Sequence, residues 1–168
     1  MKQIILSLLV VVTLIACSNH GKKVKIEGSK GEVFYKGAGV TEDDAKKLGK
    51  FLKEQEYFDD STKKSVQLIK AKDEGYEVHF VVDEKKAKEL PNVDERFLLI
   101  GALISKDVFD NKPVNVFLAD EGLKDFKTLA YDKKKAEELL SAANSSDADN
   151  VLANYKQNTI GDITFYWK

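Results

Sequence analysis

The chain contains a single cysteine, Cys17, and this scarcity excludes several kinds of site. A disulfide needs two thiols, so none can form within the chain. A redox-active thiol would lack a second cysteine to resolve its oxidised form. With only two histidines, His20 and His79, a zinc site would have to depend on carboxylates, whereas structural zinc sites use mainly Cys and His. The composition therefore predicts no metal and no other cofactor.

Arginine is as scarce as cysteine, because Arg96 is the only one and lysine supplies the other positive charges. The formal net charge is −1 at pH 7, so the chain has no basic surplus to attract a phosphate backbone. Planar guanidinium groups, which bind phosphate in a bidentate manner, are nearly absent as well. These features indicate that nucleic acid is not a partner.

Neither of the two marked apolar runs is long enough to cross a membrane. The first extends from Ile4 to Ala16, which is 13 residues, and the second from Phe97 to Ile104, which is eight. At about 1.5 Å per residue the longer run covers roughly 20 Å, whereas a hydrocarbon core of ~30 Å needs about 20 residues. A lysine before the first run and the small Ala16 at its end follow the layout of a secretory signal. We therefore predict a signal peptide over residues 1–16.

The end of this run, Leu14-Ile15-Ala16-Cys17, resembles the lipobox of bacterial lipoproteins. The resemblance implies cleavage before Cys17 and a thiol that carries a diacylglyceryl group with acyl chains such as palmitate. Two or more acyl chains anchor a protein stably, whereas one chain is marginal. The resemblance thus implies a protein of the bacterial cell envelope, anchored to a membrane on its non-cytoplasmic face. Cys17 is the only site residue to which the sequence assigns a chemistry.

Residues 17–31 follow the signal peptide and are predicted to form the lipidated cysteine and a flexible tether. The segment is polar and glycine-rich, with little periodicity. Its lysines, Lys22, Lys23 and Lys25, are interpreted most simply as solvated. Contact with anionic lipid headgroups is the alternative.

Residues 32–168 are predicted to form one α+β domain, since an overall hydrophobic content of 43% suffices for a core. Glu32 to Lys36 indicates a first strand. Thr41 and Asp44 have the spacing of a capping box and predict the start of a helix. Its apolar residues recur at helical spacing, at Ala45, Leu48, Phe51 and Leu52.

Further elements alternate along the domain. The runs 65–72 and 76–82 are joined by Asp73-Glu74-Gly75 and predict a hairpin. Asn92 and Glu95 repeat the cap spacing before an apolar helix over residues 93–105. After it come a second hairpin over 113–119 and 123–131, a helix over 133–143, a short helix from Ser146, and a strand over 161–168. This order predicts an antiparallel sheet with helices on one face.

Residues 45–82 and 97–131 resemble each other as two helix–strand–strand units. Leu48-Gly49 corresponds to Ile100-Gly101, and Asp73-Glu74-Gly75 corresponds to Asp120-Glu121-Gly122. An internal duplication explains this correspondence, and so does chance similarity between two amphipathic units. The sequence leaves both interpretations open.

No catalytic residue is predicted, and we expect the protein not to be an enzyme. His20 lies in the predicted tether, and His79 lies on the more polar face of its strand, where a solvated side chain is expected. No G-x-S-x-G motif is present to supply a nucleophile. Gly37-Ala38-Gly39 is interpreted as a tight turn rather than a phosphate loop, because three acidic residues follow it. The acidic clusters are interpreted as turn and cap residues rather than calcium ligands, and they occur at Asp59-Asp60, Asp73-Glu74, Asp120-Glu121 and Asp147 to Asn150.

The expected function is that of a membrane-anchored, non-enzymatic binding or interaction module whose partner is an envelope protein. A narrower version is an immunity or inhibitor lipoprotein that blocks a toxin or hydrolase. The alternatives are a carrier of a small ligand or lipid, which a large apolar cavity would favour, and an envelope hydrolase, which would need an inward-facing pair of carboxylates in a cleft.

Overall fold

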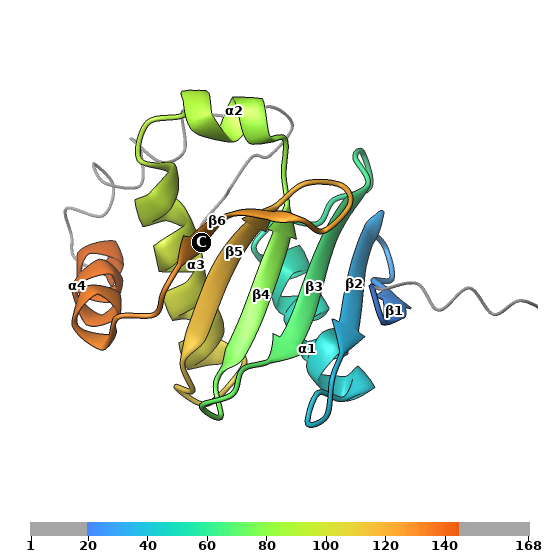
Figure 1. Ribbon diagram of the computed structural model, residues 1–168, viewed down its shortest axis with the longest axis horizontal. Helices are drawn as coiled ribbons and strands as arrows, with labels where there is room; N and C mark the ends of the chain where they lie inside the picture. The colour runs from blue at the N-terminus through green and yellow to red at the C-terminus, as the bar shows by residue number, and fades with distance from the viewer. Residues whose placement is uncertain (1–19, 145–168) are drawn as a thin grey trace, which may run out of the picture.

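The computed structural model describes residues 20–144 (Figure 1). The predicted signal peptide and Cys17 lie outside the described residues. So do the short helix predicted from Ser146 and the strand predicted over residues 161–168.

Six strands form one sheet, and their spatial order is the same as their order in the chain. Neighbouring strands are therefore always consecutive in sequence. The strands are β1 (Lys22–Lys25), β2 (Gly31–Lys36), β3 (Lys64–Lys70), β4 (Tyr76–Val81), β5 (Val114–Ala119) and β6 (Asp125–Leu129).

Four helices accompany the sheet in the described part of the chain. They are α1 (Glu42–Glu54), α2 (Glu84–Glu89), α3 (Val93–Asp107) and α4 (Lys133–Asn144). Among the described residues, no helix has both the length and the apolar character that crossing a bilayer requires.

The α+β class is confirmed, whereas the sheet is mixed rather than wholly antiparallel. Each hairpin, β1–β2, β3–β4 and β5–β6, is antiparallel. The pairs β2–β3 and β4–β5 are parallel. The reason is that α1 and α3 form crossovers, which return the chain to the end of the sheet where the previous strand began.

The N-terminal strand β1 corrects the prediction of a tether that reaches residue 31. Lys22–Lys25 pair with β2 along its outer edge, with Val24 opposite Val33. The sequence KKVK lacks the alternation and the β-branched content on which strand prediction depends. Its lysines are typical of an edge strand, where charge discourages pairing with other chains.

With β1 included, the described chain consists of a hairpin followed by helical structure, three times over. The helices that follow the hairpins are α1, the α2–α3 pair, and α4. Each hairpin turn contains a Glu-Gly pair, and the glutamates Glu27, Glu74 and Glu121 recur every 47 residues. The alignment of residues 45–82 with residues 97–131 within this sequence identified only the second and third of these turns. An origin of the units by duplication stays a prediction.

The hydrophobic core lies between the sheet and the helices. Helix α1 packs on β2 and α3 packs on β5, so these two helices cover one face of the sheet, and α4 packs on α3 (Figure 1). Fully burying an aliphatic or phenylalanine side chain contributes about 1.5–3 kcal/mol. A row of cross-strand neighbours with 0% exposure runs through this core and consists of Val33, Val66, Phe80 and Leu118.

Two helix starts differ in how they are capped. The predicted capping box at α1 is confirmed, because Thr41 Oγ1 accepts from the Asp44 amide at 3.1 Å and the Thr41 amide donates to Asp44 Oδ2 at 2.9 Å. The predicted cap at Asn92 is wrong, although helix α3 does begin at the next residue. Asn92 has a left-handed backbone with φ of 57°, and its side chain makes no cap hydrogen bond.

Candidate binding face

One face of the sheet is left uncovered by the described helices, and we call it the open face. In the view of Figure 1, α1 and α3 lie behind the sheet and the open face is turned to the viewer. Because side chains alternate along each strand, the residues between the core valines point to this face. Four of them lie directly opposite one another across β2 to β5, and we call them the central row: Phe34, Gln67, His79 and Phe117.

His79 is the most constrained member of the central row. Its ring stacks on that of Phe117, with 4.4 Å between centroids and 10° between planes. Its Nδ1 lies 2.7 Å from Oδ1 of Asp125 on β6, and its Nε2 lies 3.6 Å from Oε2 of Glu77. The residue is only 6% exposed, so the prediction of a solvated His79 is wrong. Sequence alternation identifies the face but not the neighbours that bury a side chain on it.

Gln67 is held by the segment predicted to be a free tether. It is 2% exposed, and its Nε2 donates to the backbone carbonyl of His20 at 2.8 Å. The His20 ring meets the Phe34 ring edge to face at 5.7 Å, and Lys23 Nζ lies 5.7 Å from the centroid of the same Phe34 ring. Residue 20 therefore lies on the open face rather than in solvent.

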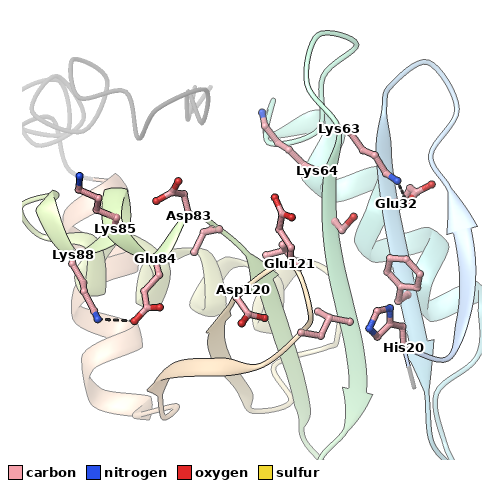
Figure 2. A pocket seen from close by; sticks show the side chains of 15 residues that line it. His20, Glu32, Lys63, Lys64, Asp83, Glu84, Lys85, Lys88, Asp120 and Glu121 are labelled. Atoms are coloured by element: carbon pink, nitrogen blue, oxygen red, sulfur yellow. Dashed lines mark hydrogen bonds and ion pairs between the residues drawn. The ribbon is translucent and has the colours of Figure 1, made fainter. Parts of the chain in front are cut away.

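A hollow of about 1050 Å³ lies at one end of the open face (Figure 2). It is located where β2 and β3 begin and β4 and β5 end. His20 and Phe34 form part of its wall, so the hollow is continuous with the central row. Four lysines and five carboxylates also line it, and they are Lys63, Lys64, Lys85, Lys88, Glu32, Asp83, Glu84, Asp120 and Glu121.

Many of these charges are already paired with one another. Glu32 Oε1 lies 2.9 Å from Lys23 Nζ. Its Oε2 lies 3.2 Å from Lys63 Nζ, and Figure 2 shows this second pair. Burial acts to raise the pKa of Glu32, but the hydrogen bonds from the two lysines outweigh it and the net pKa is lowered. Lys88 and Glu84 form a second pair at 2.6 Å. The hollow is therefore polar but does not concentrate charge of one sign.

The turn carboxylates perform the structural roles expected of them. Asp59 Oδ1 accepts from the amides of Ser61 and Thr62, each at 2.8 Å, and its Oδ2 pairs with buried Lys64 at 2.5 Å. These bonds lower the pKa of Asp59 well below its usual range, although burial opposes them. Asp120 Oδ1 accepts from two amides in the β5–β6 turn. The interpretation as turn residues is confirmed for these two aspartates.

The Gly37-Ala38-Gly39 turn and the groups that could hold a metal ion can both be examined within residues 20–144. Gly37 and Gly39 have φ of 95° and 86°, so the stretch between β2 and α1 is a turn that needs glycine. Within residues 20–144, no three His, Cys, Asp or Glu side chains gather in a way that could hold a metal ion. Asp147 to Asn150 lie outside the described residues.

The His79–Asp125 pair orients an imidazole on the open face. Asp125 can fix the Nδ1 tautomer, as a carboxylate does in a catalytic triad. The Nε2 atom makes no hydrogen bond to a described residue, and the group 3.6 Å away is the carboxylate of Glu77. Because Nε2 is buried and the ring stacks on Phe117, the imidazole supports the half-buried Phe117 ring on this face.

Sequence reasoning missed most of this face. The alternation in EVFYK, SVQLIK and PVNVFLA places Phe34, Gln67 and Phe117 opposite the core valines, and this signal was available. Asp125 could not be assigned, because the pairing of β5 with β6 shifts between Leu118 and Ala119. An irregular register of this kind has no sequence pattern that identifies it.

The fold and this face define a class of protein, an α+β domain with helices on one side of its sheet and, on the other, a face that no helix of residues 20–144 covers. Residues 23–130 match a protein-family model described as the N-terminal domain of its family, and the chain belongs to that family. The matched region extends from β1 into the residues after β6. Comparison with curated proteins and with solved structures found no match.

Proposed function

We propose that the protein is a lipid-anchored binding module of the bacterial cell envelope, which recognises an envelope protein through the open face of its sheet. The observation that carries the proposal is the central row: two half-buried phenylalanine rings, Phe34 and Phe117, flank two polar side chains that are held in place, on a face that the described helices leave uncovered. The lipobox that ends at Cys17 supports the anchor.

The central row has the composition of a protein interface. Aromatic residues, phenylalanine among them, are enriched at protein interfaces, and Phe34 and Phe117 supply such rings. Gln67 and His79 are held by hydrogen bonds to His20 and Asp125, so little side-chain entropy remains to be lost on binding. A rigid face of this kind favours recognition of a folded partner.

A small polar ligand in the hollow is the second candidate. The volume of about 1050 Å³ is sufficient for such a molecule. The charged lining opposes an apolar lipid, because each buried charge would lose its hydration. Binding of such a ligand is expected to protect Glu32 and Lys63 from chemical modification while leaving partner capture unchanged.

The proposal is tested by capture from intact envelopes with the full-length lipidated protein. The variant Phe117→Ala removes a half-buried ring from the open face. Phe126→Ala removes a half-buried ring from β6 that packs against the core instead, and serves as the matched control. We expect one stoichiometric partner with the natural chain and with Phe126→Ala, and its loss with Phe117→Ala. Equal capture by both variants would contradict a role for the open face.

The anchor is tested separately by mass spectrometry of the mature N-terminus. The expected result is a chain that begins at Cys17 and carries a diacylglyceryl group. A Cys17→Ala variant is expected to stay unlipidated. An unmodified thiol at Cys17 in the natural protein would overturn the lipoprotein assignment while leaving the open face to be judged by capture.

A further inference from the structure

The β1–β2 hairpin carries a local excess of positive charge in a chain that is nearly neutral overall. Residues 20–36 contain five lysines and two glutamates, while the whole chain has a net charge of −1. One of the glutamates, Glu32, is buried and already bound to Lys23 and Lys63. We call Lys22, Lys23, Lys25 and Lys30 the basic edge, and all four are exposed.

The basic edge has charge available for a partner. Lys22 and Lys25 form no ion pair with the described residues, and both extend from the outermost strand of the sheet. Lysines on an edge strand discourage pairing with another strand, which accounts for their presence but not for their position in the chain. The hairpin is also the part of the described domain closest in sequence to Cys17.

The short link to Cys17 fixes where this charge must lie. His20 is three residues after Cys17 and is held on the open face through its carbonyl, which accepts from Gln67. Three residues span at most about 11 Å, and the five residues to Lys22 span at most about 18 Å. Electrostatic attraction at physiological salt extends about 8 Å from a charged surface, and a lysine side chain adds its own length. A lipidated Cys17 would therefore bring the basic edge to the headgroup region.

From this placement we infer that the basic edge docks on an anionic membrane surface, so that the domain lies with β1 toward the lipid and presents the open face to the side. The inference depends on the proposed lipid anchor at Cys17. Each lysine held close to an anionic surface strengthens binding by about fivefold. In Figure 1, α4 lies at the opposite side of the molecule from β1, so it is the element held away from the lipid.

The chain permits a direct measurement of this orientation. Once Cys17 is lipidated no free thiol remains, because the sequence has no other cysteine. A cysteine introduced by Glu27→Cys in the β1–β2 turn, or by Glu138→Cys on the exposed surface of α4, is then the only site for a fluorescent label. The lipidated protein is reconstituted in vesicles of phosphatidylcholine with phosphatidylglycerol, which contain a headgroup quencher.

We expect the label at Glu27→Cys to be quenched several-fold more strongly than the label at Glu138→Cys. Replacing phosphatidylglycerol with phosphatidylcholine, or adding Lys22→Glu and Lys25→Glu, should reduce this difference severalfold. Lys72→Glu with Lys112→Glu, which makes the same change in charge at exposed sites outside the hairpin, should not reduce it.

The possible failures are distinguishable. Equal quenching of the two labels, with the protein still sedimenting with vesicles, overturns docking of the basic edge and leaves the anchor intact. Loss of sedimentation by the natural chain overturns the anchor, and with it the docking inference. Strong quenching at Glu27→Cys that persists in phosphatidylcholine alone also overturns the role of charge.

Discussion

At the scale of single residues, the side chains on the open face are positioned by partners from other elements. His79 lies on β4, yet its stacking partner is on β5 and its hydrogen-bonding partner is on β6. The result is an imidazole that is held in one orientation at 6% exposure. The orientation of His79 therefore depends on both Phe117 and Asp125.

Asp125→Ala is expected to lower the free energy of unfolding. It leaves His79 Nδ1 buried without its hydrogen bond, and an unsatisfied buried polar atom costs about 1–3 kcal/mol. Chemical denaturation of the two proteins measures the difference. Thr128→Ala, at an exposed position on the same strand, is the control and should change stability by less than about 0.5 kcal/mol. An equally small change for Asp125→Ala would contradict the assigned contact.

Asp59 is expected to make stability depend on pH in the acid range. Its pKa in the folded state lies below its usual value of 3.8, so it stabilises the fold above that value and loses this contribution as the pH falls through the folded pKa. Asp59→Asn should therefore cost about 1–3 kcal/mol at neutral pH, because Lys64 loses its charged partner. The cost should shrink as the pH falls from about 3.8 toward about 2, because the aspartate of the unfolded chain is then protonated and the charge contributes less to folding.

Unfolding measured at both pH values checks this prediction. Asp60→Asn, at the exposed neighbouring position, is the matched control and should show little change at either pH. A cost for Asp59→Asn that is the same in acid and at neutral pH would show that the carboxylate charge is not responsible.

At the scale of elements, the two repeated glycines in the helices explain how closely helix and sheet approach. A Cβ atom on Gly49 of α1 would collide with Ile26, and one on Gly101 of α3 would lie 2.8 Å from Val116 Cγ2. The alignment of the two units within the sequence matched these two glycines but did not explain why glycine occurs at both positions. The structure supplies the reason, which is that each glycine lies where its helix closely approaches a neighbouring element: Gly49 faces Ile26, just after β1, and Gly101 faces β5.

Gly101→Ala is expected to destabilise the protein by about 1–3 kcal/mol, because the added methyl group overpacks the contact with β5. The sign is informative, since helix propensity alone would make the same change stabilising by about 1 kcal/mol. Thermal and chemical unfolding measure it. Lys106→Ala, at an exposed position of the same helix, serves as the control, and a stabilised Gly101→Ala variant would contradict the close approach.

Local signals predicted most of the elements, and long-range pairing determined the rest. The α1 capping box, the β3–β4 hairpin and the apolar face of α1 were predicted because each depends on residues close in sequence. The parallel pairs and β1 were missed because they depend on which strands become neighbours. The contacts on the open face were missed for the same reason, since Gln67 and His20 are separated by 47 residues.

At the scale of the whole molecule, the three hairpin–helix units produce a domain with two unlike faces and one basic edge. All crossovers pass on the same side of the sheet, which leaves the other side uncovered by the described helices. The edge strand comes first in the described chain, so the part nearest the proposed anchor also carries a local excess of positive charge. Orientation at a membrane would then follow from topology and charge together.

Lengthening the link between Cys17 and His20 separates the contribution of the short link from the contribution of lysine charge to orientation at the membrane. A flexible insert of about 20 residues has an r.m.s. span of roughly 25 Å, well beyond the range of attraction at physiological salt. In the natural chain the short link keeps the basic edge close to the surface, so raised salt should weaken quenching of the label at Glu27→Cys without abolishing it. In the lengthened chain the contact depends on lysine charge alone, and quenching should fall to the level of the label at Glu138→Cys as salt screens it. The same salt response in both chains would show that the link does not determine the orientation, and the position of the basic edge next to the anchor would then have no mechanical consequence.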